Sequence, residues 1–428
     1  MSSFSLAGKG LKLDTKEDIQ KHIQPLSDND KITSIDLSGN TLGVGACEAL
    51  APVLKSKSTL EFADLHDIFT QRLVDEIPPA LDYLLTALLE CPNLHTIDLS
   101  DNAFGLKTKD PLVDFLSKHT PLRHLILNNN GMGPIAGTSI AEALTQLAKR
   151  KEEVRRSGKE VPDLESIVCG RNRLENGSME AWAQAYSAHN KMKSVKMTQN
   201  GIRPEGIVEL IKNGLSKCKS LEVFDLQDNT FTFRGATALA SAIQKWPQLK
   251  ELGVGDDLLG GRGSIKVFEV LAKGQNKNVE VLRLDFNDIT PAGVASLLTA
   301  AQDGLPSLRR VEINGNKFEE DDASIEKLSA LLEERKDEKG TDNDPEDHWG
   351  IGELDELEGE AEDDEEEDEE DLADEDEEEE EKNAEQVHKR AVGVETLKAD
   401  EKAENADVGQ KKDKDVDDLA DLLDKTKV

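Results

Sequence analysis

The residue that this sequence offers most clearly for chemistry is Asn129, in the segment PLRHLILNNNGMG. Leu122, Leu125 and Leu127 alternate along a short strand, so their side chains share one buried face. The amide of Asn130 can then turn inward and hydrogen-bond the backbone where the strand bends. Asn129 comes one residue earlier and should point toward solvent. We therefore expect an exposed amide directly beside a structural one.

The sequence lacks the motifs of a self-contained catalytic centre. It has no G-x-x-x-x-G-K-[ST] loop, no G-x-S-x-G turn, and no Cys/His pair at catalytic spacing. The glycine-rich run GVGDDLLGGRG falls on a short strand and its turn. Dense carboxylates occur only near the C-terminus, where no predicted element holds their geometry. We expect a surface that acts on a partner, without a metal site or cofactor of its own.

The pattern around Asn130 recurs along most of the chain. It fits L-x-x-L-x-L-x-x-N, the signature of leucine-rich repeats, in nine good copies and one degenerate copy. The last position of each copy, here called the ladder position, is residue 40, 68, 102, 130, 172, 200, 229, 257, 287 or 316. Most spacings are 28 to 30 residues, which leaves room for a helix after each strand. The pattern predicts an α/β leucine-rich-repeat solenoid, a horseshoe of the ribonuclease-inhibitor kind, with parallel strands on the concave side and helices on the convex side.

Three regions are predicted. Residues 1–31 form an N-terminal cap, in which FSLAGKGLKLD is a short strand and Thr15 caps the helix that follows. Residues 32–340 form the repeat domain, closed by a helix near 322–334. Residues 341–428 form a charged tail, whose acidic run cannot collapse and should be disordered.

Charge and cysteine usage restrict the partners and the compartment. The formal net charge is −36, and residues 353–381 hold 23 acidic side chains and no basic one. An acidic surface repels phosphates, which disfavours nucleic acid and favours basic protein partners. The four cysteines form no C-x-x-C pair, and no apolar run approaches the length of a membrane span. We expect reduced thiols in a cytosolic or nuclear protein. The four cysteines are Cys47, Cys91, Cys169 and Cys218.

One residue before each ladder position should face solvent at the edge of the sheet; these residues form the rim. In order they are Gly39, Asp67, Asp101, Asn129, Arg171, Gln199, Asp228, Asp256, Phe286 and Gly315. The loop DIFTQRLVDEIPPAL breaks the leucine pattern, which marks function more often than packing. Its Arg72 should be exposed on the same rim as Asn129, two strands or about 10 Å away, so that one partner could meet both. The basic insertion KRKEEVRRSGKE should lengthen a convex helix.

These residues resemble the Ran GTPase-activating proteins in their short fungal-like form. The resemblance extends from the N-terminus to the acidic tail, and the loop that carries Arg72 is similar to the arginine-bearing loop of that family. The other matching segments are SDNAFG, DFLSKHTPL, NNG, CGRNRLENGS, QNGIRPEGI and DLQDNTF.

The resemblance implies that this chain accelerates GTP hydrolysis by Ran. Ras-type GTPases hydrolyse GTP slowly because a switch glutamine positions the attacking water poorly. In this family a rim asparagine is understood to order that glutamine, and by position it is Asn129. Arg72 looks like a residue for partner binding or loop support, not an arginine finger. Weaker interface candidates are Asp67, Asp101, Asn130, Arg171, Gln199 and Asp228.

The resemblance also implies a setting. The partner is Ran in its GTP form, and GTP and magnesium belong to that partner, so this chain needs no cofactor. A Ran-binding co-activator protein can join the complex. We expect a monomer in the cytoplasm or near the nucleus, working in nucleocytoplasmic transport without nucleic acid or membrane binding.

Three alternatives stay open at this stage. Arg72 could act as a finger, the usual device beside a GTPase phosphate site. The chain could be a non-catalytic scaffold or inhibitor of a basic protein, as ribonuclease inhibitors are, or an acidic histone-binding chaperone. Val74 places an apolar side chain in the arginine loop where a charge is expected.

Overall fold

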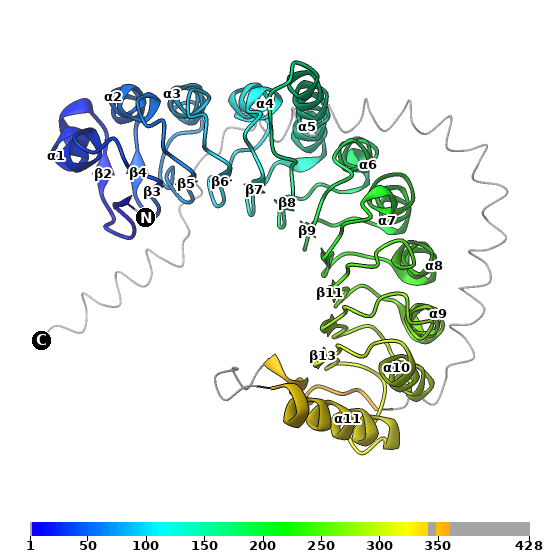
Figure 1. Cartoon of the computed structure of the whole chain (residues 1–428). Helices are drawn as coiled ribbons and strands as arrows, with labels where there is room; N and C mark the ends of the chain where they lie inside the picture. The colour runs from blue at the N-terminus through cyan, green and yellow to red at the C-terminus, as the bar shows by residue number, and fades with distance from the viewer. Residues whose placement is uncertain (1, 341–347, 360–428) are drawn as a thin grey trace, which may run out of the picture. The chain divides into compact units, whose positions relative to one another are not determined.

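The computed structural model describes residues 2–340 and 348–359, which form one curved stack of repeats (Figure 1). Parallel strands line the inner side of the curve, and helices cover the outer side. The predicted leucine-rich-repeat solenoid is confirmed. The main sheet contains, within the described residues, β1 Ser3–Ser5, β3 Ser34–Asp36, β5 Phe62–Asp64, β6 Thr96–Asp98, β7 His124–Ile126, β8 Ser166–Val168, β9 Ser194–Lys196, β10 Val223–Asp225, β11 Glu251–Gly253, β12 Val281–Arg283, β13 Arg310–Glu312 and β14 Gly350–Ile351.

Each strand has three residues or fewer. In the three-residue strands the central residue is buried, as Leu125 is in β7. The helices turn an apolar face onto these strands, so the core is one continuous layer between sheet and helices. The helices are α1 Lys16–Ser27, α2 Val44–Lys55, α3 Ile77–Leu88, α4 Lys109–Lys118, α5 Gly133–Arg156, α6 Met179–Ala188, α7 Pro204–Glu209, α8 Thr232–Ile243, α9 Gly260–Leu271, α10 Pro291–Asp303 and α11 Ala323–Lys339. No helix of the described residues is both long and apolar enough to cross a membrane.

The ladder residues join the repeats by a chain of buried amides. Asn130 is 1% exposed, and its Nδ2 donates to the carbonyls of Leu99 and Asn128, each at 3.1 Å. Its Oδ1 accepts the backbone N–H of Asn102 at 2.9 Å. Asn172 repeats the arrangement one strand further, accepting the backbone N–H of Asn130. The amide oxygen therefore pairs a backbone N–H that would otherwise be buried without a partner, and the amide nitrogen adds a second hydrogen bond to each of two carbonyls.

A second set of polar side chains joins the repeats, at the position three residues before the first leucine of the repeat pattern. Trp246 Nε1 donates to the carbonyl of Leu215 at 3.0 Å, and the Cys218 thiol lies 3.5 Å from the carbonyl of Tyr186. His119 Nε2 lies 2.7 Å from the carbonyl of Leu94. The cysteine and tryptophan side chains at this position are buried in the core, and they also supply donors that the repeat pattern did not suggest.

The N-terminal cap differs from the prediction of one strand. Two short strands form instead, because glycines at positions 8 and 10, with φ of 64° and 59°, turn the chain between them. β1 pairs with β3, and β2, Lys12–Leu13, pairs with β4, Thr41–Leu42. The predicted helix cap is confirmed: Thr15 and Asp18 form a reciprocal capping box at α1.

The tail begins later than predicted. Residues 348–359 were expected to belong to a loose tail from 341 onward, and this part of the boundary is wrong. β14 pairs in parallel with β13, and Ile351, Leu354 and Leu357 pack against the core. They cover the last repeat, whose sheet edge would otherwise stay open to water. The acidic run from residue 360 onward lies outside the described residues.

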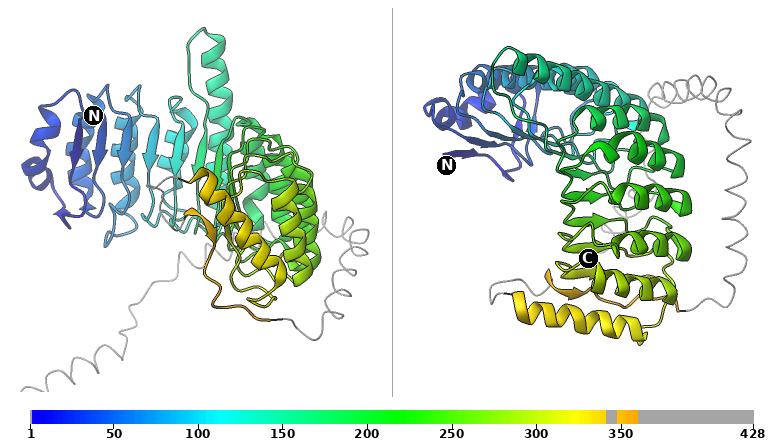
Figure 2. Two further views of the ribbon diagram at one scale, coloured as in Figure 1. Left: turned by 60° about the horizontal axis from the view of Figure 1, so that its bottom comes forward. Right: turned by 45° about the vertical axis from the view of Figure 1, so that its right-hand side comes forward.

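The basic insertion lengthens α5 to 24 residues, as predicted, and Figure 2 shows this helix extending beyond its neighbours. Lys151 lies inside this part of the structure at 1% exposure. Its ammonium group donates to the carbonyls of Thr120, Leu122 and Pro162 at 2.6 to 2.9 Å. Burial lowers the pKa of Lys151 to about 7. These hydrogen bonds of Lys151 connect the extended helix α5 to the backbone before β7 and to the segment that leads into β8.

Candidate functional site

The rim is built from left-handed backbone. All ten predicted rim residues have positive φ, between 48° and 65°. This conformation costs a non-glycine residue on the order of 1 kcal/mol or more, with asparagine and aspartate tolerating it best. This cost is offset where the turn lets the next residue, an asparagine in eight of the ten repeats, place its amide in the core. The strict repeat of this turn presents one rim side chain per repeat along a single edge.

Asn129 lies on the rim as predicted, exposed to solvent and with φ of 52°. Its backbone N–H donates to the carbonyl of Gly170 at 2.9 Å, which fixes the main chain. Its Nδ2 donates to Oδ1 of Asp101, the rim residue of the preceding repeat, at 2.7 Å. A primary amide has two N–H groups and one carbonyl oxygen. Among the contacts of the described residues, this bond leaves Oδ1 and one N–H of Asn129 for a partner.

Asn130 cannot meet a partner, contrary to its prediction as an interface residue. Its side chain is buried and engaged in the ladder on both its donor and acceptor sides. The reason is the left-handed backbone at Asn129, after which the amide of Asn130 faces the core while the side chain of Asn129 faces solvent. The two adjacent amides therefore separate into an exposed one and a structural one.

Arg72 is not the exposed side chain that the sequence predicted. Only 7% of it is accessible, and its guanidinium forms an ion pair with Asp14. Nε donates to Oγ1 of Thr41 at 2.9 Å, and a terminal nitrogen donates to the Thr41 carbonyl at 2.9 Å. These partners belong to the N-terminal cap and first repeat, so the structure does not bring Arg72 and Asn129 together. The arginine fastens its loop to the cap.

The tip of this loop exposes two apolar side chains, Leu73 at 71% and Val74 at 54%. The loop itself is anchored, because Phe69 is buried and the Leu73 N–H donates to Glu76 Oε2 at 3.2 Å. An apolar tip on an anchored loop is typical of a docking contact. The sequence signalled only Val74, as an unexpected residue.

The remaining predicted interface residues stand along the same edge. Arg171 and Gln199 are exposed, while Asp67 and Asp228 are partly covered. Burial, reinforced by nearby Asp256, raises the pKa of Asp228. Further along, Leu258 and Phe286 are large apolar side chains that are 50% and 45% exposed despite positive φ. The rim thus combines charges of both signs with apolar anchors, which suits a protein partner.

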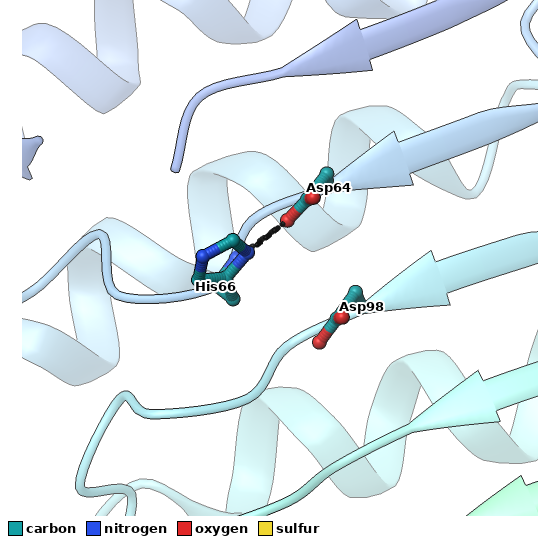
Figure 3. Close-up of side chains that lie close together, drawn as sticks. All are labelled: Asp64, His66 and Asp98. Carbon is teal, nitrogen blue, oxygen red and sulfur yellow. Dashed lines mark hydrogen bonds and ion pairs between the residues drawn. The ribbon is translucent and has the colours of Figure 1, made fainter. Parts of the chain in front are cut away.

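On the concave face, Asp64 and His66 of one repeat and Asp98 of the next gather at one point (Figure 3). Nδ1 of His66 lies 2.6 Å from Oδ1 of Asp64. Burial alone would lower the pKa of His66, but the bond to Asp64 and the charges of Asp98 and Asp101 more than offset it, so the pKa is raised. Burial raises the pKa of Asp98, against hydrogen bonds from Ser100. Sequence reasoning missed this cluster, because Asp64 and Asp98 are ordinary outward residues at the ends of two strands and His66 lies in the turn after the first.

The fold and the repeated turn define a leucine-rich-repeat protein with a mixed polar and apolar rim. The family model described as Leucine Rich repeat matches residues 28–51, 217–240 and 275–298. Among solved structures, the leucine-rich repeat-containing protein LegL7 from Legionella pneumophila aligns at a TM-score of 0.43 and 14% identity, over 78% of this chain and 98% of that chain.

Relatives define the family more narrowly. The chain is 42% identical over 339 residues to Ran GTPase-activating protein 1 of Saccharomyces cerevisiae, a match that covers 77% of this chain and 82% of that protein. It is 40% identical over 208 residues to Ran GTPase-activating protein 2 of Caenorhabditis elegans, covering 48% of this chain and 21% of that protein. The chain belongs to the Ran GTPase-activating protein family.

Proposed function

We propose that this protein stimulates GTP hydrolysis by the small GTPase Ran, acting on Ran in its GTP form. Family membership supports the choice of partner. The observation that carries the mechanism is the exposed amide of Asn129, held in one orientation by Asp101. The chain supplies no nucleotide or magnesium chemistry in this proposal, since both belong to the partner.

Asn129 orders the switch glutamine of Ran. The slow step of such GTPases reflects poor positioning of the water by that glutamine. An amide can donate to the glutamine carbonyl and accept from its NH₂ group at the same time. Asp101 occupies one N–H of Asn129 and leaves the remaining donor and the acceptor directed outward. Because the backbone of Asn129 is bonded to Gly170 and its neighbour is locked in the ladder, the amide acts as a preorganised guide.

Arg72 has a supporting role. A finger would have to leave Asp14 and Thr41 before it could reach a phosphate, and that costs the bonds that hold the loop. Fastened as it is, the arginine positions the apolar tip at Leu73 and Val74 for docking. We place this activity in the cytoplasm or near the nucleus, where it serves nucleocytoplasmic transport. The protein acts as a monomer, and a Ran-binding co-activator can join its complex with Ran.

Single-turnover hydrolysis by GTP-loaded Ran tests the proposal, with affinity measured separately on Ran carrying a non-hydrolysable analogue. Asn129→Gly is the sharp variant, since glycine accepts the positive φ without strain. It should lose most of the acceleration at saturating concentration and keep binding within a few-fold. Gln199→Gly, at the same rim position two repeats along, is the matched control and should keep the acceleration.

Two results would overturn parts of this account. Full acceleration by Asn129→Gly would refute the amide mechanism while leaving the activity intact. No acceleration by the unaltered chain would refute the activity and favour a non-catalytic scaffold for a basic protein. The second candidate rests on the acidic rim residues Asp67, Asp101, Asp228 and Asp256, and binding to a basic ribonuclease or core histones would support it.

A further inference from the structure

The cluster of Asp64, His66 and Asp98 is a candidate ligand set outside the site described above. One atom from each residue lies within 4.8 Å of the other two, from partly buried side chains. The two aspartates are direct partners in the parallel pairing of β5 and β6, so the sheet itself sets their separation. Figure 3 shows the imidazole and both carboxylates at the ends of these neighbouring strands.

Each carboxylate is held by the turn that follows its strand. The backbone N–H of His66 donates to Oδ1 of Asp64 at 3.1 Å, and that of Ser100 donates to Oδ1 of Asp98 at 2.9 Å. These bonds engage the Oδ1 atom of each carboxylate and, among the hydrogen bonds of the described residues, leave Oδ2 for another ligand. Such supporting bonds to ligand side chains are what preorganised metal sites require.

The charge at this point favours a dication. The charged groups that act on Asp98 are Asp64 and His66, and those that act on His66 are Asp64, Asp98 and Asp101. Three carboxylates therefore surround one imidazole, and even a protonated imidazole leaves an excess of negative charge. A doubly charged ion would neutralise the partly buried pair of aspartates.

We propose that Asp64, His66 and Asp98 form a binding site for a transition-metal dication of the zinc class on the concave face. One imidazole nitrogen with two carboxylate oxygens suits zinc, cobalt or manganese better than calcium or magnesium, which prefer oxygen alone. Zinc accepts four ligands, so three protein ligands leave a position open toward the concave surface. This inference is independent of the activity on Ran.

Zn²⁺ titration by calorimetry tests the site, with Co²⁺ absorption as a second readout of the ligand geometry. The full chain is used in a large excess of Mg²⁺, because the many carboxylates of the C-terminal run also attract divalent ions. Test variants are His66→Gln and Asp98→Asn, and the matched control is His124→Gln, a partly buried strand histidine that faces Ser166 at 2.9 Å. Circular dichroism checks that all four chains are folded.

The unaltered chain and His124→Gln should bind one equivalent of Zn²⁺ that withstands Mg²⁺. Both test variants should lose this equivalent or bind it at least roughly ten-fold more weakly, since even outer-shell changes at metal sites have effects of that size. Equal binding by all four chains would place the ion elsewhere and refute the site. Absence of an Mg²⁺-resistant equivalent in the unaltered chain would refute it as well.

Discussion

Asp257 occupies a ladder position that asparagine fills in the neighbouring repeats, and replacing it by asparagine should stabilise the protein. Its Oδ1 accepts the backbone N–H of Asn229 at 2.9 Å, as an asparagine oxygen would. Its Oδ2 is buried without a hydrogen-bond partner among the described residues. In the next repeat, Asn287 places Nδ2 at this point and donates to the carbonyls of Val254 and Leu284. Burial raises the pKa of Asp257 well above its usual value, and the carboxyl does not make the donor bonds that an amide makes at this position.

The free energy needed to protonate an aspartate at pH 7 sets an upper limit for the expected gain in stability. An aspartate with an unfolded pKa near 3.9 that must be protonated to fold costs at most roughly 4 kcal/mol at pH 7. A satisfied amide adds about 1 kcal/mol. We expect Asp257→Asn to raise the free energy of unfolding by about 2 to 4 kcal/mol at pH 7. Because the folded form binds the extra proton, this destabilisation by Asp257 grows as pH rises above about 4 and vanishes below it.

Urea unfolding at pH 4 and pH 7 measures the effect, followed by circular dichroism. The gain should be large at pH 7 and small at pH 4. Asp256→Asn, on the exposed rim one residue earlier, is the matched control and should change stability by less than about 0.5 kcal/mol. The reasoning fails if Asp257→Asn brings no gain at pH 7, or the same gain at both pH values.

Three further predictions concern other parts of the repeat domain. Asn130→Ala leaves the buried N–H of Asn102 unpaired and removes one of two hydrogen bonds from each of two carbonyls, so it should lower the midpoint of urea unfolding and cost about 2 to 3 kcal/mol; a cost below about 1 kcal/mol would contradict its ladder role. Arg72→Ala should cost about 1 to 3 kcal/mol of stability in thermal unfolding and should weaken binding to Ran, while the acceleration at saturating concentration is retained. Arg72→Lys should not restore the stability or the binding. Loss of acceleration with intact binding would instead support the arginine-finger role. Burial lowers the pKa of His119 and of His189 to about 4. Because the folded protein holds both imidazoles neutral, their contribution to the free energy of unfolding is fully present above pH 6.5 and is lost toward pH 4, by at most roughly 3 kcal/mol for each. The free energy of unfolding of the His119→Gln, His189→Gln double variant should lose this part of its pH dependence. The same pH dependence in the double variant and the unaltered chain would refute the assignment to these histidines.

Much of the architecture could be predicted from the sequence, since a repeat uses local rules many times over. The alternation of leucines sets which side chains are buried, and the ladder asparagine sets where each strand bends. These rules correctly predicted that the side chain of Asn129 is exposed and that of Asn130 buried. The family resemblance nevertheless led us to name Asn130 as an interface candidate. The cap with two strands and the late start of the tail were missed, because short strands depend on a neighbouring strand for their hydrogen bonds.

The sequence by itself determined the period, the fold class and the rim, because these follow from contacts between residues a few positions apart, repeated along the chain. Only the tertiary structure decided that Arg72 turns to Asp14, 58 residues away, and that β14 pairs with β13. It also decided that His66 meets Asp98 across two strands. Such pairings depend on the stacking of one repeat on the next, and no periodicity within a single repeat encodes which outward side chains will face each other.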